Sequence, residues 1–351
     1  MNDLRSSLYQ IHGLLVESEI PLHAARIDAD RDGRTAQPRS GAGVSPDYRI
    51  RLGGPRDCPP SPPPGRILAE FRDDGFATWT TEARRDPGRR MLRYAGICDV
   101  VLDRGRRTII VHPAFEADPG RIPIFLEGNV LAHALAAEDL LVLHASAVQV
   151  EGRALAIIGP SGGGKSTLAA LLCSVGARLV TDDALRVDPT SSGAVCYPGS
   201  HGIRLRPAAA SLGREIDGAT VQATADGRTK VLPTRRADAP LKLQAVLVPE
   251  PSREAQELQV RRLGAMAGLQ ELLRHPRLTV WRAPGPIGRL FALTAEVAPG
   301  LPVYRATVPW GPPFPPGLAE ELLASVGLGA ACGQSTAEPD RSSASDPQTG
   351  L

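Results

Sequence analysis

The sequence predicts an α/β domain preceded by a smaller β-rich domain, and three observations carry this prediction. Residues 159–166 read Gly-Pro-Ser-Gly-Gly-Gly-Lys-Ser and match the pattern G-x-x-x-x-G-K-[ST]. An apolar strand pattern at 154–158 precedes this loop, and an amphipathic helix pattern follows it up to Gly176. Between 66 and 112, short β-like runs alternate with turn residues, which is typical of a small antiparallel β domain.

The composition is that of a globular protein and excludes several classes. The chain has 351 residues, enough for about two domains, and 42% of them are hydrophobic and 22% charged. Its 40 basic and 38 acidic residues leave a net charge of +2, too small to indicate a nucleic-acid-binding surface. Five widely spaced cysteines without a CxxC pair predict neither disulfides nor a zinc site. No apolar stretch approaches about 18 residues and no signal peptide is recognisable, so we expect a cytoplasmic protein without membrane contact.

Residues 1–65 are expected to form an N-terminal segment ahead of the β-rich domain. A short helix or an edge segment is expected over 1–22. Residues 28–65 are rich in Arg, Asp, Gly, Ser and Pro and end in the run CPPSPPPG. Such a stretch cannot bury enough apolar surface to fold well, so most of it is predicted to be a mobile loop. The small β-rich domain is expected over 66–120, with strands at 67–71, 76–80, 91–94, 99–102 and 108–111.

A larger domain is predicted over 121–330. Apolar positions at helical spacing predict a helix over 122–140. Apolar runs at 140–150 and 154–158, joined by Glu-Gly-Arg, predict a β-hairpin. Residues 331–351 are mainly Ser, Thr, Pro, Asp and Gly and predict a disordered tail. Further strands are predicted at 178–181, 184–187, 194–197 and 244–248, and helices at 264–275, 286–297 and 316–327.

The glycine-rich loop contains the residue types that phosphate binding requires. Glycines adopt backbone conformations closed to other residues, which lets several N–H groups converge on one anion. Lys165 is placed to reach the β- and γ-phosphates and the Ser166 hydroxyl to ligate Mg²⁺, while the following helix directs its positive end at the anion. Lys165 is also one of only three lysines among the 40 basic residues, which indicates that its chemistry is needed. The expected phosphate-binding residues are Gly159, Pro160, Ser161, Gly162, Gly163, Gly164, Lys165, Ser166 and Thr167.

Two adjacent carboxylates, Asp182 and Asp183, follow the strand predicted at 178–181. In P-loop folds an acidic residue at the end of a neighbouring strand binds Mg²⁺. At a strand end the two side chains point in different directions, so that one can serve the metal and the other the acceptor hydroxyl. A turn or a helix cap is the ordinary alternative for such a pair. Its position one helix after the glycine-rich loop favours the functional interpretation.

His144 lies in the apolar segment 143–148, which is expected to pair with the strand that leads into the loop. A lone histidine in an apolar strand is usually a core residue with satisfied hydrogen bonds. Here its neighbourhood offers another role, because a histidine on this strand can hydrogen-bond one of the two aspartates and tune its basicity.

Taken together, these residues resemble the catalytic core of HPr kinase/phosphorylase. The resemblance rests on His144-Ala-Ser-Ala-Val, on the loop ending in Lys165-Ser166-Thr167, and on Leu179-Val180-Thr181-Asp182-Asp183, at the family's spacing. It is closer still to HPr-kinase-related proteins encoded with lasso-peptide and other ribosomal-peptide pathways, which carry a β-rich domain ahead of such a strand. It is specific over about 140–206 and looser over 66–139 and 240–310. It implies a P-loop kinase domain with a mixed β-sheet, akin to phosphoenolpyruvate carboxykinase, and we expect a homo-oligomer.

By this resemblance Lys165 binds the phosphates of ATP, Ser166 and Asp182 lie at Mg²⁺, and Asp183 accepts the proton of a substrate serine with the help of His144. The chain also departs from the family. Residues 199–207 contain no counterpart of the family's second acidic ligand, and the loop linked to phosphorolysis is not recognisable. We therefore expect kinase activity alone, on an acceptor other than HPr. The sequence lacks the LSGGQ motif of transporter ATPases and the N-K-x-D motif of GTPases, so the preference for ATP rests on the resemblance.

Three further cationic residues are candidates for contacts with phosphate or substrate. Arg204 and Arg206 alternate along a predicted strand and therefore share one face, where guanidinium groups can clamp a phosphate or a carboxylate. Solvation at the surface is the ordinary alternative. Lys230 ends a turn-like segment, 226–230, from which it could reach the transferred phosphoryl group; a plain turn is an equal alternative.

Two functions of different classes follow from these features. In the first, the protein is an ATP-dependent serine kinase acting on a small protein or a ribosomal precursor peptide, and its β-rich domain recognises the polypeptide or mediates assembly. In the second, it is a nucleotide-dependent escort module of a peptide maturation pathway without phosphotransfer. A small-molecule kinase or a carboxykinase-like enzyme is a weaker third interpretation.

Overall fold

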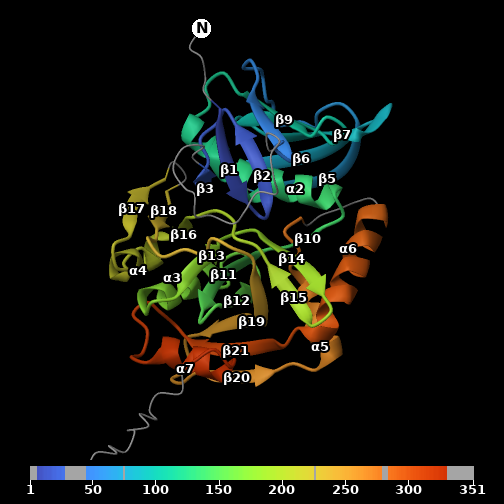
Figure 1. Ribbon diagram of the computed structural model, residues 1–351. Helices are drawn as coiled ribbons and strands as arrows, with labels where there is room; N and C mark the ends of the chain where they lie inside the picture. The colour runs from blue at the N-terminus through green and yellow to red at the C-terminus, as the bar shows by residue number, and fades with distance from the viewer. Residues whose placement is uncertain (1–5, 28–44, 74–75, 225–226, 279–283, 330–351) are drawn as a thin grey trace, which may run out of the picture.

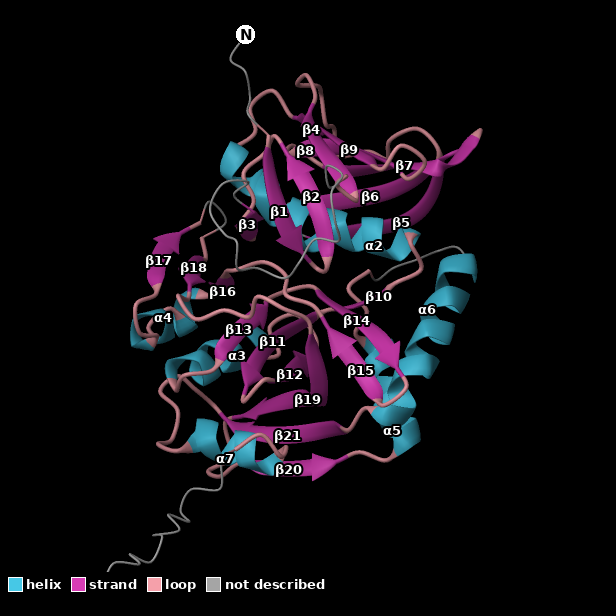
Figure 2. Cartoon of the chain, viewed as in Figure 1, coloured by secondary structure: helices cyan, strands magenta, loops and turns pink. Residues whose placement is uncertain are grey.

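The computed structural model describes residues 6–27, 45–73, 76–224, 227–278 and 284–329. Two large β-sheets lie one above the other, the upper one built by the N-terminal part of the chain and the lower one by the part that carries the glycine-rich loop (Figure 1). Short helices join and flank them (Figure 2). The tail predicted at 331–351 and the stretch 28–44 lie outside the described residues.

The upper sheet has nine strands, in the order β3-β1-β2-β4-β9-β8-β7-β6-β5. Most neighbours are antiparallel, but β4 pairs in parallel with both β2 and β9, so the sheet is mixed rather than antiparallel. Its strands are β1 (Ser7–Ile11), β2 (Leu14–Ser18), β3 (Ala25–Ile27), β4 (Tyr48–Leu52), β5 (Arg66–Asp73), β6 (Phe76–Ala83), β7 (Asp86–Tyr94), β8 (Cys98–Asp103) and β9 (Thr108–Pro113).

Among the described residues, 7–18 do not form the short helix that was one expectation for 1–22, and 48–52 are not part of a loop. Residues 7–18 form a hairpin around His12 and Gly13, which both have positive φ, as a tight two-residue turn requires. Strand β4 lies within the stretch expected to be a mobile loop. It forms because Tyr48 and Ile50 alternate with polar residues and are completely buried, which is the period of a strand with one face in the core.

A helical segment connects the two sheets and packs its apolar side under the upper one. It consists of a 3-10 turn η1 (Pro119–Arg121), helix α1 (Ile122–Phe125), a π-helical turn η2 (Leu126–Val130) and helix α2 (Leu131–Ala137). Leu126, Val130 and Leu135 belong to one buried cluster with Ile50 and Val100 of the upper sheet. The helix predicted over 122–140 is thus confirmed, but a π-turn interrupts it, and such turns are frequent at functional sites.

The lower sheet is also mixed. Its order is β10-β14-β15-β19-β12-β11-β13, with β21 beside β19 and β20 beside β21. Strand β12 runs parallel to β19 and antiparallel to β11, and the predicted 140–158 hairpin is β11 and β12. The strands are β10 (Leu141–Leu143), β11 (Ala145–Val150), β12 (Arg153–Ile158), β13 (Arg178–Thr181), β14 (Leu185–Thr190), β15 (Gly193–Cys196), β19 (Leu241–Ser252), β20 (Gln259–Arg262) and β21 (Val303–Pro309).

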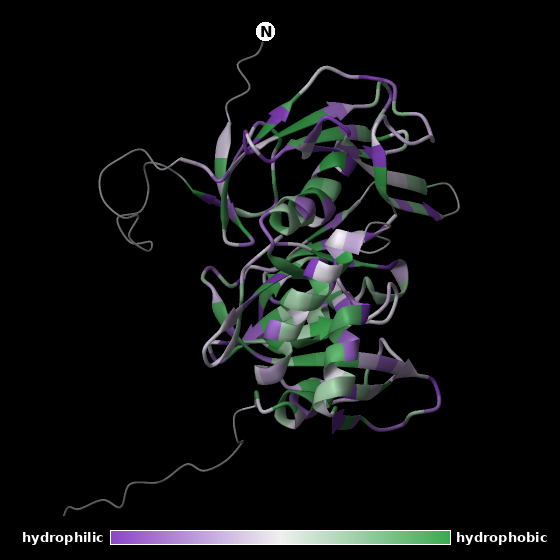
Figure 3. Ribbon diagram, turned by 90° about the vertical axis from the view of Figure 1, so that its right-hand side faces the viewer, coloured by the Kyte–Doolittle hydropathy of each residue, from purple (hydrophilic) through white to green (hydrophobic). Residues whose placement is uncertain are grey.

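Helices cover both faces of this sheet, and strand β12 shows why. Leu155 and Ile157 lie in one buried cluster with α3 (Lys165–Ser174) and α7 (Leu318–Ser325), whereas Ala156 and Ile158 lie in another with α5 (Ala265–Arg274) and α6 (Pro284–Val297). A strand apolar on both sides needs cover on both sides. Figure 3 shows the hydrophobic residues gathered along these inner strands and helices.

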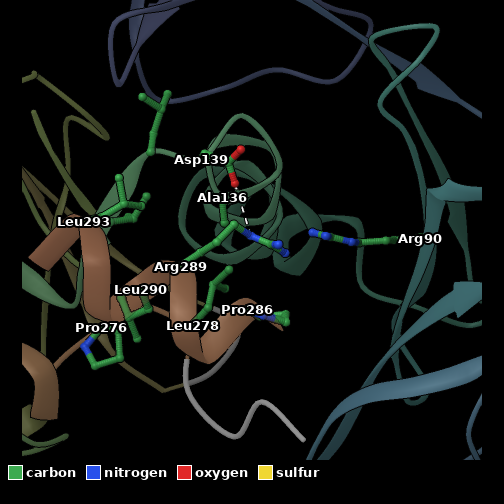
Figure 4. A pocket seen from close by; sticks show the side chains of 11 residues that line it. Arg90, Ala136, Asp139, Pro276, Leu278, Pro286, Arg289, Leu290 and Leu293 are labelled. Carbon is green, nitrogen blue, oxygen red and sulfur yellow. Dashed lines mark ion pairs between the residues drawn. The ribbon is translucent and has the colours of Figure 1, made fainter. Parts of the chain in front are cut away.

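Smaller elements complete the lower part. A three-stranded sheet is formed by β16 (Ile203–Leu205), β18 (Thr229–Leu232) and β17 (Thr220–Ala223), next to η3 (Pro207–Ala209) and α4 (Leu212–Glu215). A final 3-10 turn, η4, spans Ala298–Gly300. Helix α6 packs Leu290 and Leu293 near the end of α2 (Figure 4). Among the described residues no helix is both long and apolar enough to cross a lipid bilayer.

Candidate active site

The glycine-rich loop joins the buried strand β12 to helix α3, as the sequence pattern predicts. Gly162 and Gly164 have φ of +83° and +88°, a region that other residues enter only with strain. Helix α3 begins at Lys165, so its free N–H groups face the loop. Loop amides and the helix N-terminus together form the kind of anion cradle that phosphates occupy.

Lys165 is folded back onto its own loop. Its Nζ donates to the carbonyl oxygens of Gly159 and Pro160, both at 2.9 Å, and only 7% of the residue is exposed. Burial lowers the pKa of Lys165. In P-loop folds a lysine at this position reaches the β- and γ-phosphates, so the terminal phosphate of a bound nucleotide would lie on the Gly159–Pro160 side of the loop.

Asp182 is the hub of a buried hydrogen-bond network. Its carboxylate accepts from the Ser146 hydroxyl at 2.5 Å, from the Ser166 hydroxyl at 2.9 Å and from the Arg204 amide at 3.0 Å. Burial raises the pKa of Asp182, against the opposing effect of these donors. A bound cation would offset the desolvation that this charge experiences.

The Ser166 and Asp182 oxygens fit Mg²⁺, which prefers hard oxygen ligands and usually takes one or two carboxylates plus substrate phosphates. The described part of the chain has no group of three His, Cys, Asp or Glu side chains arranged to hold a metal ion. The protein would therefore contribute Ser166 and Asp182 to the ion, with the phosphates supplying further oxygens.

Asp183 points away from this network, toward a different set of partners. Arg277 Nη2 donates to Asp183 Oδ2 at 2.7 Å, and His144 Nε2 lies 3.4 Å from Oδ1. Burial works to raise the pKa of Asp183, but the charge of Arg277 and its hydrogen bond to the carboxylate outweigh burial and hold the pKa below its ordinary value. Asp183 has φ of +85°, and one third of its side chain remains exposed. Strained backbone of this kind clusters at functional sites.

His144 occupies a bend between β10 and β11 rather than the middle of one strand. Its amide donates to the His275 carbonyl at 2.9 Å, which fixes the bend. Burial lowers the pKa of His144 to about 4, although the neighbouring Asp183 carboxylate opposes this. The imidazole is therefore neutral at neutral pH. It can orient the Asp183 carboxylate without forming an ion pair that would neutralise it.

Gly128 and Arg277 complete the surroundings of Asp183, and the sequence interpretation did not include either. A Cβ on Gly128 would lie 2.2 Å from Asp183 Oδ2, so only glycine lets the π-turn approach this carboxylate. A glycine inside a helical pattern was the one available signal. Arg277 carried none, because it follows helix α5 and is 94 positions away from Asp183.

Of the three candidate cations, the two arginines lie at the loop and the lysine does not. Arg204, Arg206 and Arg228 line a hollow of about 640 Å³ together with the loop, His144 and both aspartates. Arg206 lies beside the loop, since a Cβ on Gly162 would be 3.3 Å from its Nη1. Lys230 is buried in β18 opposite Arg204 and is not among the described residues that line this hollow; burial lowers its pKa to about 8.

Glu127, next to Gly128, is a second buried carboxylate absent from the sequence interpretation. It accepts from the His23 amide at 2.5 Å and from the Ser200 hydroxyl at 2.5 Å, and His23 Nδ1 lies 2.9 Å away. Burial works to raise the pKa of Glu127, but its hydrogen bonds with His23 prevail and lower it. This carboxylate ties the π-turn to the N-terminal segment and to the 199–203 loop.

Among known proteins, the chain is similar to solved structures. No family model matches the chain, and no curated protein matches it. Among solved structures, the Hpr(Ser) kinase/phosphatase from Coxiella burnetii is similar with a TM-score of 0.26 and 12% sequence identity, over 48% of this chain and 85% of that chain.

Proposed function

We propose that this protein is an ATP-dependent kinase that phosphorylates a serine hydroxyl. The observation that carries the proposal is the division of labour between two adjacent carboxylates. Asp182 is bound to the loop serine, where a metal ion would sit, whereas Asp183 faces His144 and Arg277 and leaves a third of its side chain exposed. A protein that only binds a nucleotide needs the first carboxylate but not the second.

In this mechanism the loop amides, Lys165 and the arginines of the hollow hold the phosphates of ATP. Ser166 and Asp182 would hold Mg²⁺, which would supply positive charge that offsets the negative charge of the phosphates. Asp183 Oδ1 accepts a hydrogen bond from the hydroxyl of the substrate serine and directs the serine oxygen at the γ-phosphorus. As the bond between the serine oxygen and phosphorus forms, the bond from phosphorus to the β–γ bridging oxygen breaks. The serine proton passes to Asp183, and ADP leaves with the electron pair of the broken bond.

The low pKa of Asp183 suits phosphoryl transfer through a loose transition state, in which the bond to the attacking oxygen is only slightly formed and a strong base is not needed. Such a carboxylate is a weak base, but it is ionised at neutral pH and can orient the hydroxyl throughout the reaction. In phosphoryl transfer, positioning and electrostatic stabilisation provide most of the catalysis. Arg277 and His144 act as positioning residues for this carboxylate.

The acceptor class is proposed from the resemblance of the sequence to HPr-kinase-related proteins. We propose a small protein or a ribosomal precursor peptide, of the kind processed in lasso-peptide pathways, as the substrate. The same resemblance supports a homo-oligomer that uses ATP and Mg²⁺. The small net charge and the lack of a long apolar stretch are the reasons to expect neither nucleic acid nor membrane as a partner.

The test is intact-mass analysis of serine-containing peptides incubated with the protein, ATP and Mg²⁺. Asp183→Asn should bind a fluorescent ATP analogue like the wild type, yet transfer no phosphate. Asp139→Asn is the matched control, because Asp139 also has positive φ and pairs with an arginine, Arg289, at 3.2 Å, but on the exposed end of α2 (Figure 4). Full transfer by Asp183→Asn would refute the proposed base. Binding without transfer in the wild type would favour the escort module.

A further inference from the structure

A second hollow, of about 1290 Å³, opens beside the phosphate-binding loop between the two sheets. We name it the aromatic trough. His144 and Ser161 line both this trough and the hollow that contains Arg204, Arg206 and Arg228, which we name the phosphate hollow, so the two lie side by side. The trough is lined by β5, β6 and β7 of the upper sheet, by the helical connection and by the start of the glycine-rich loop. His144, the last residue of α5 and the four residues that follow it complete the lining.

The trough meets the loop at the end where the terminal phosphate lies. Gly159 and Pro160, whose carbonyls hold the Lys165 ammonium, line the trough, whereas Gly162 and residues 164–167 line the phosphate hollow. In phosphoryl transfer the attacking and leaving oxygens lie roughly in line on opposite sides of phosphorus. A nucleotide in the phosphate hollow therefore directs its leaving group away from the trough, and the acceptor has to arrive through the trough.

The floor of the trough is aromatic. The rings of Phe76 and Phe125 stack with centroids 5.7 Å apart, and Tyr94 lies 4.5 Å from Phe125. Phe71 extends the row, 6.5 Å from Phe76, with 43% of the residue exposed. A continuous apolar surface next to a catalytic carboxylate is a place for an apolar side chain of the substrate.

One wall of the trough is an edge strand. Strand β5 ends the order of the upper sheet, so one of its sides has no neighbour among the described strands. Successive residues of a strand face opposite sides. Because Ala69, Glu70 and Phe71 all line the trough, the trough reaches the edge of β5 itself. Where backbone N–H and C=O groups at a sheet edge have no strand beside them, an extended polypeptide can pair with them.

Two arginines also line the trough. Arg274, at the end of α5, has 62% of its side chain exposed, and Arg277 is the second. Both already face a carboxylate, Glu271 and Asp183 respectively, and His275 lies between them. Arg274 is the more exposed of the two and can also pair with an acidic group of an incoming substrate.

We infer that the acceptor is a polypeptide segment that binds in extended form along β5. A large apolar side chain of this segment, close to the serine that is phosphorylated, packs on the rings of Phe71 and Phe76. An acidic residue of the same segment pairs with Arg274. This inference rests on the proposed kinase function for its account of the reaction, but the docking itself needs no catalysis. It gives the upper sheet a role in substrate recognition.

The test is affinity selection of a synthetic peptide library, with one central serine and randomised flanking positions, on the immobilised full-length protein loaded with a non-hydrolysable ATP analogue. We expect enrichment of Phe, Tyr, Trp or Leu at a fixed offset from serine, and of Asp or Glu at another. Phe71→Ala should weaken binding of the selected peptide at least about 10-fold. Phe115→Ala, which removes a 72% exposed ring outside the trough, should not.

Backbone pairing with β5 has its own readout. N-methylation of the selected peptide, one amide at a time, should weaken binding at every second position, because alternate amides of an added strand face the edge. Binding without any preference for an apolar residue, or unaffected by Phe71→Ala, would overturn the docking inference even if phosphate transfer occurs. Selective docking without transfer to any selected serine would instead leave the docking in place and refute the kinase proposal.

Discussion

Arg277 Nη2 donates to Asp183 Oδ2 at 2.7 Å, although the two residues are 94 positions apart in the chain. The contact leaves Oδ1 facing His144, at 3.4 Å from Nε2. Arg277 thus holds one oxygen of the carboxylate, and the other oxygen faces the position that we propose for the acceptor hydroxyl. The ion pair also keeps the pKa of Asp183 low despite burial, so that the group is charged at neutral pH.

Removing this arginine should shift the acidic limit of activity upward in pH. Without Arg277, Asp183 loses the largest effect that opposes burial and its pKa rises, so that the carboxylate becomes protonated at a higher pH than in the wild type. We expect Arg277→Gln to lower kcat roughly 10²-fold through misplacement of Asp183. The pH–rate profile of phosphate transfer measures both effects. Arg289→Gln, which breaks a similar pair with Asp139, should leave the profile unchanged, and an unmoved acidic limit in Arg277→Gln would contradict the assignment.

Gly128→Ala should reduce transfer while sparing nucleotide binding. The added methyl would overlap Asp183 Oδ2, so the carboxylate or the π-turn has to move, whereas Lys165 and Ser166 have no contact with this position. We expect about a 10-fold or larger loss in kcat with an unchanged dissociation constant for ATP. In Gly288→Ala, on an open face of α6, the new methyl meets nothing within 4 Å and should stabilise the helix by roughly 0.5–1 kcal/mol. Equal kcat values for Gly128→Ala and the wild type would show that Asp183 does not require this close approach.

Asp182→Asn should abolish the effect of Mg²⁺ on nucleotide affinity. In the wild type, addition of Mg²⁺ should tighten ATP binding because the ion relieves the desolvation of Asp182 and links it to the phosphates. Titration of a fluorescent ATP analogue, with Mg²⁺ or with a chelator, gives the ratio of the two affinities. We expect that ratio to fall toward one in Asp182→Asn and to remain at the wild-type value in Asp139→Asn. A preserved ratio in Asp182→Asn would place the ion elsewhere.

Glu127→Gln should destabilise the protein at neutral pH and much less in acid. The pKa of Glu127 in the folded state is below its ordinary value of 4.5, so its stabilising contribution is complete above pH 4.5 and is lost as the pH falls through the folded value. Weakening its hydrogen bonds with His23 and Ser200 should cost about 1–3 kcal/mol. Urea unfolding from pH 7 downward measures the difference, with the exposed Glu151→Gln as control. A difference that does not shrink below pH 4.5 would contradict this account.

The local part of the site could be predicted from the sequence. The strand β12, the glycine-rich loop and helix α3 are contiguous, and their residue types satisfy one local geometric requirement after another: an apolar period, glycines at positive φ, and a lysine and a serine at the start of a helix. The same holds for the hairpin of β11 and β12, which depends on the period of a strand. Asp182 and Asp183 do point in different directions, but they lie beyond the end of β13 and Asp183 has positive φ, so the cause is the local turn and not the strand period.

What surrounds Asp183 was decided by tertiary structure. Gly128, Arg277 and the aromatic trough come from separate elements that meet only because the upper sheet packs onto the helical connection. The strand β4 escaped prediction for a related reason: five residues between polar stretches form a strand only when neighbours on both sides supply its hydrogen bonds. The sequence by itself determined the anion cradle, because that chemistry is encoded within one short segment. Folding decided which groups face the second carboxylate, because those contacts depend on packing between segments that no local pattern links.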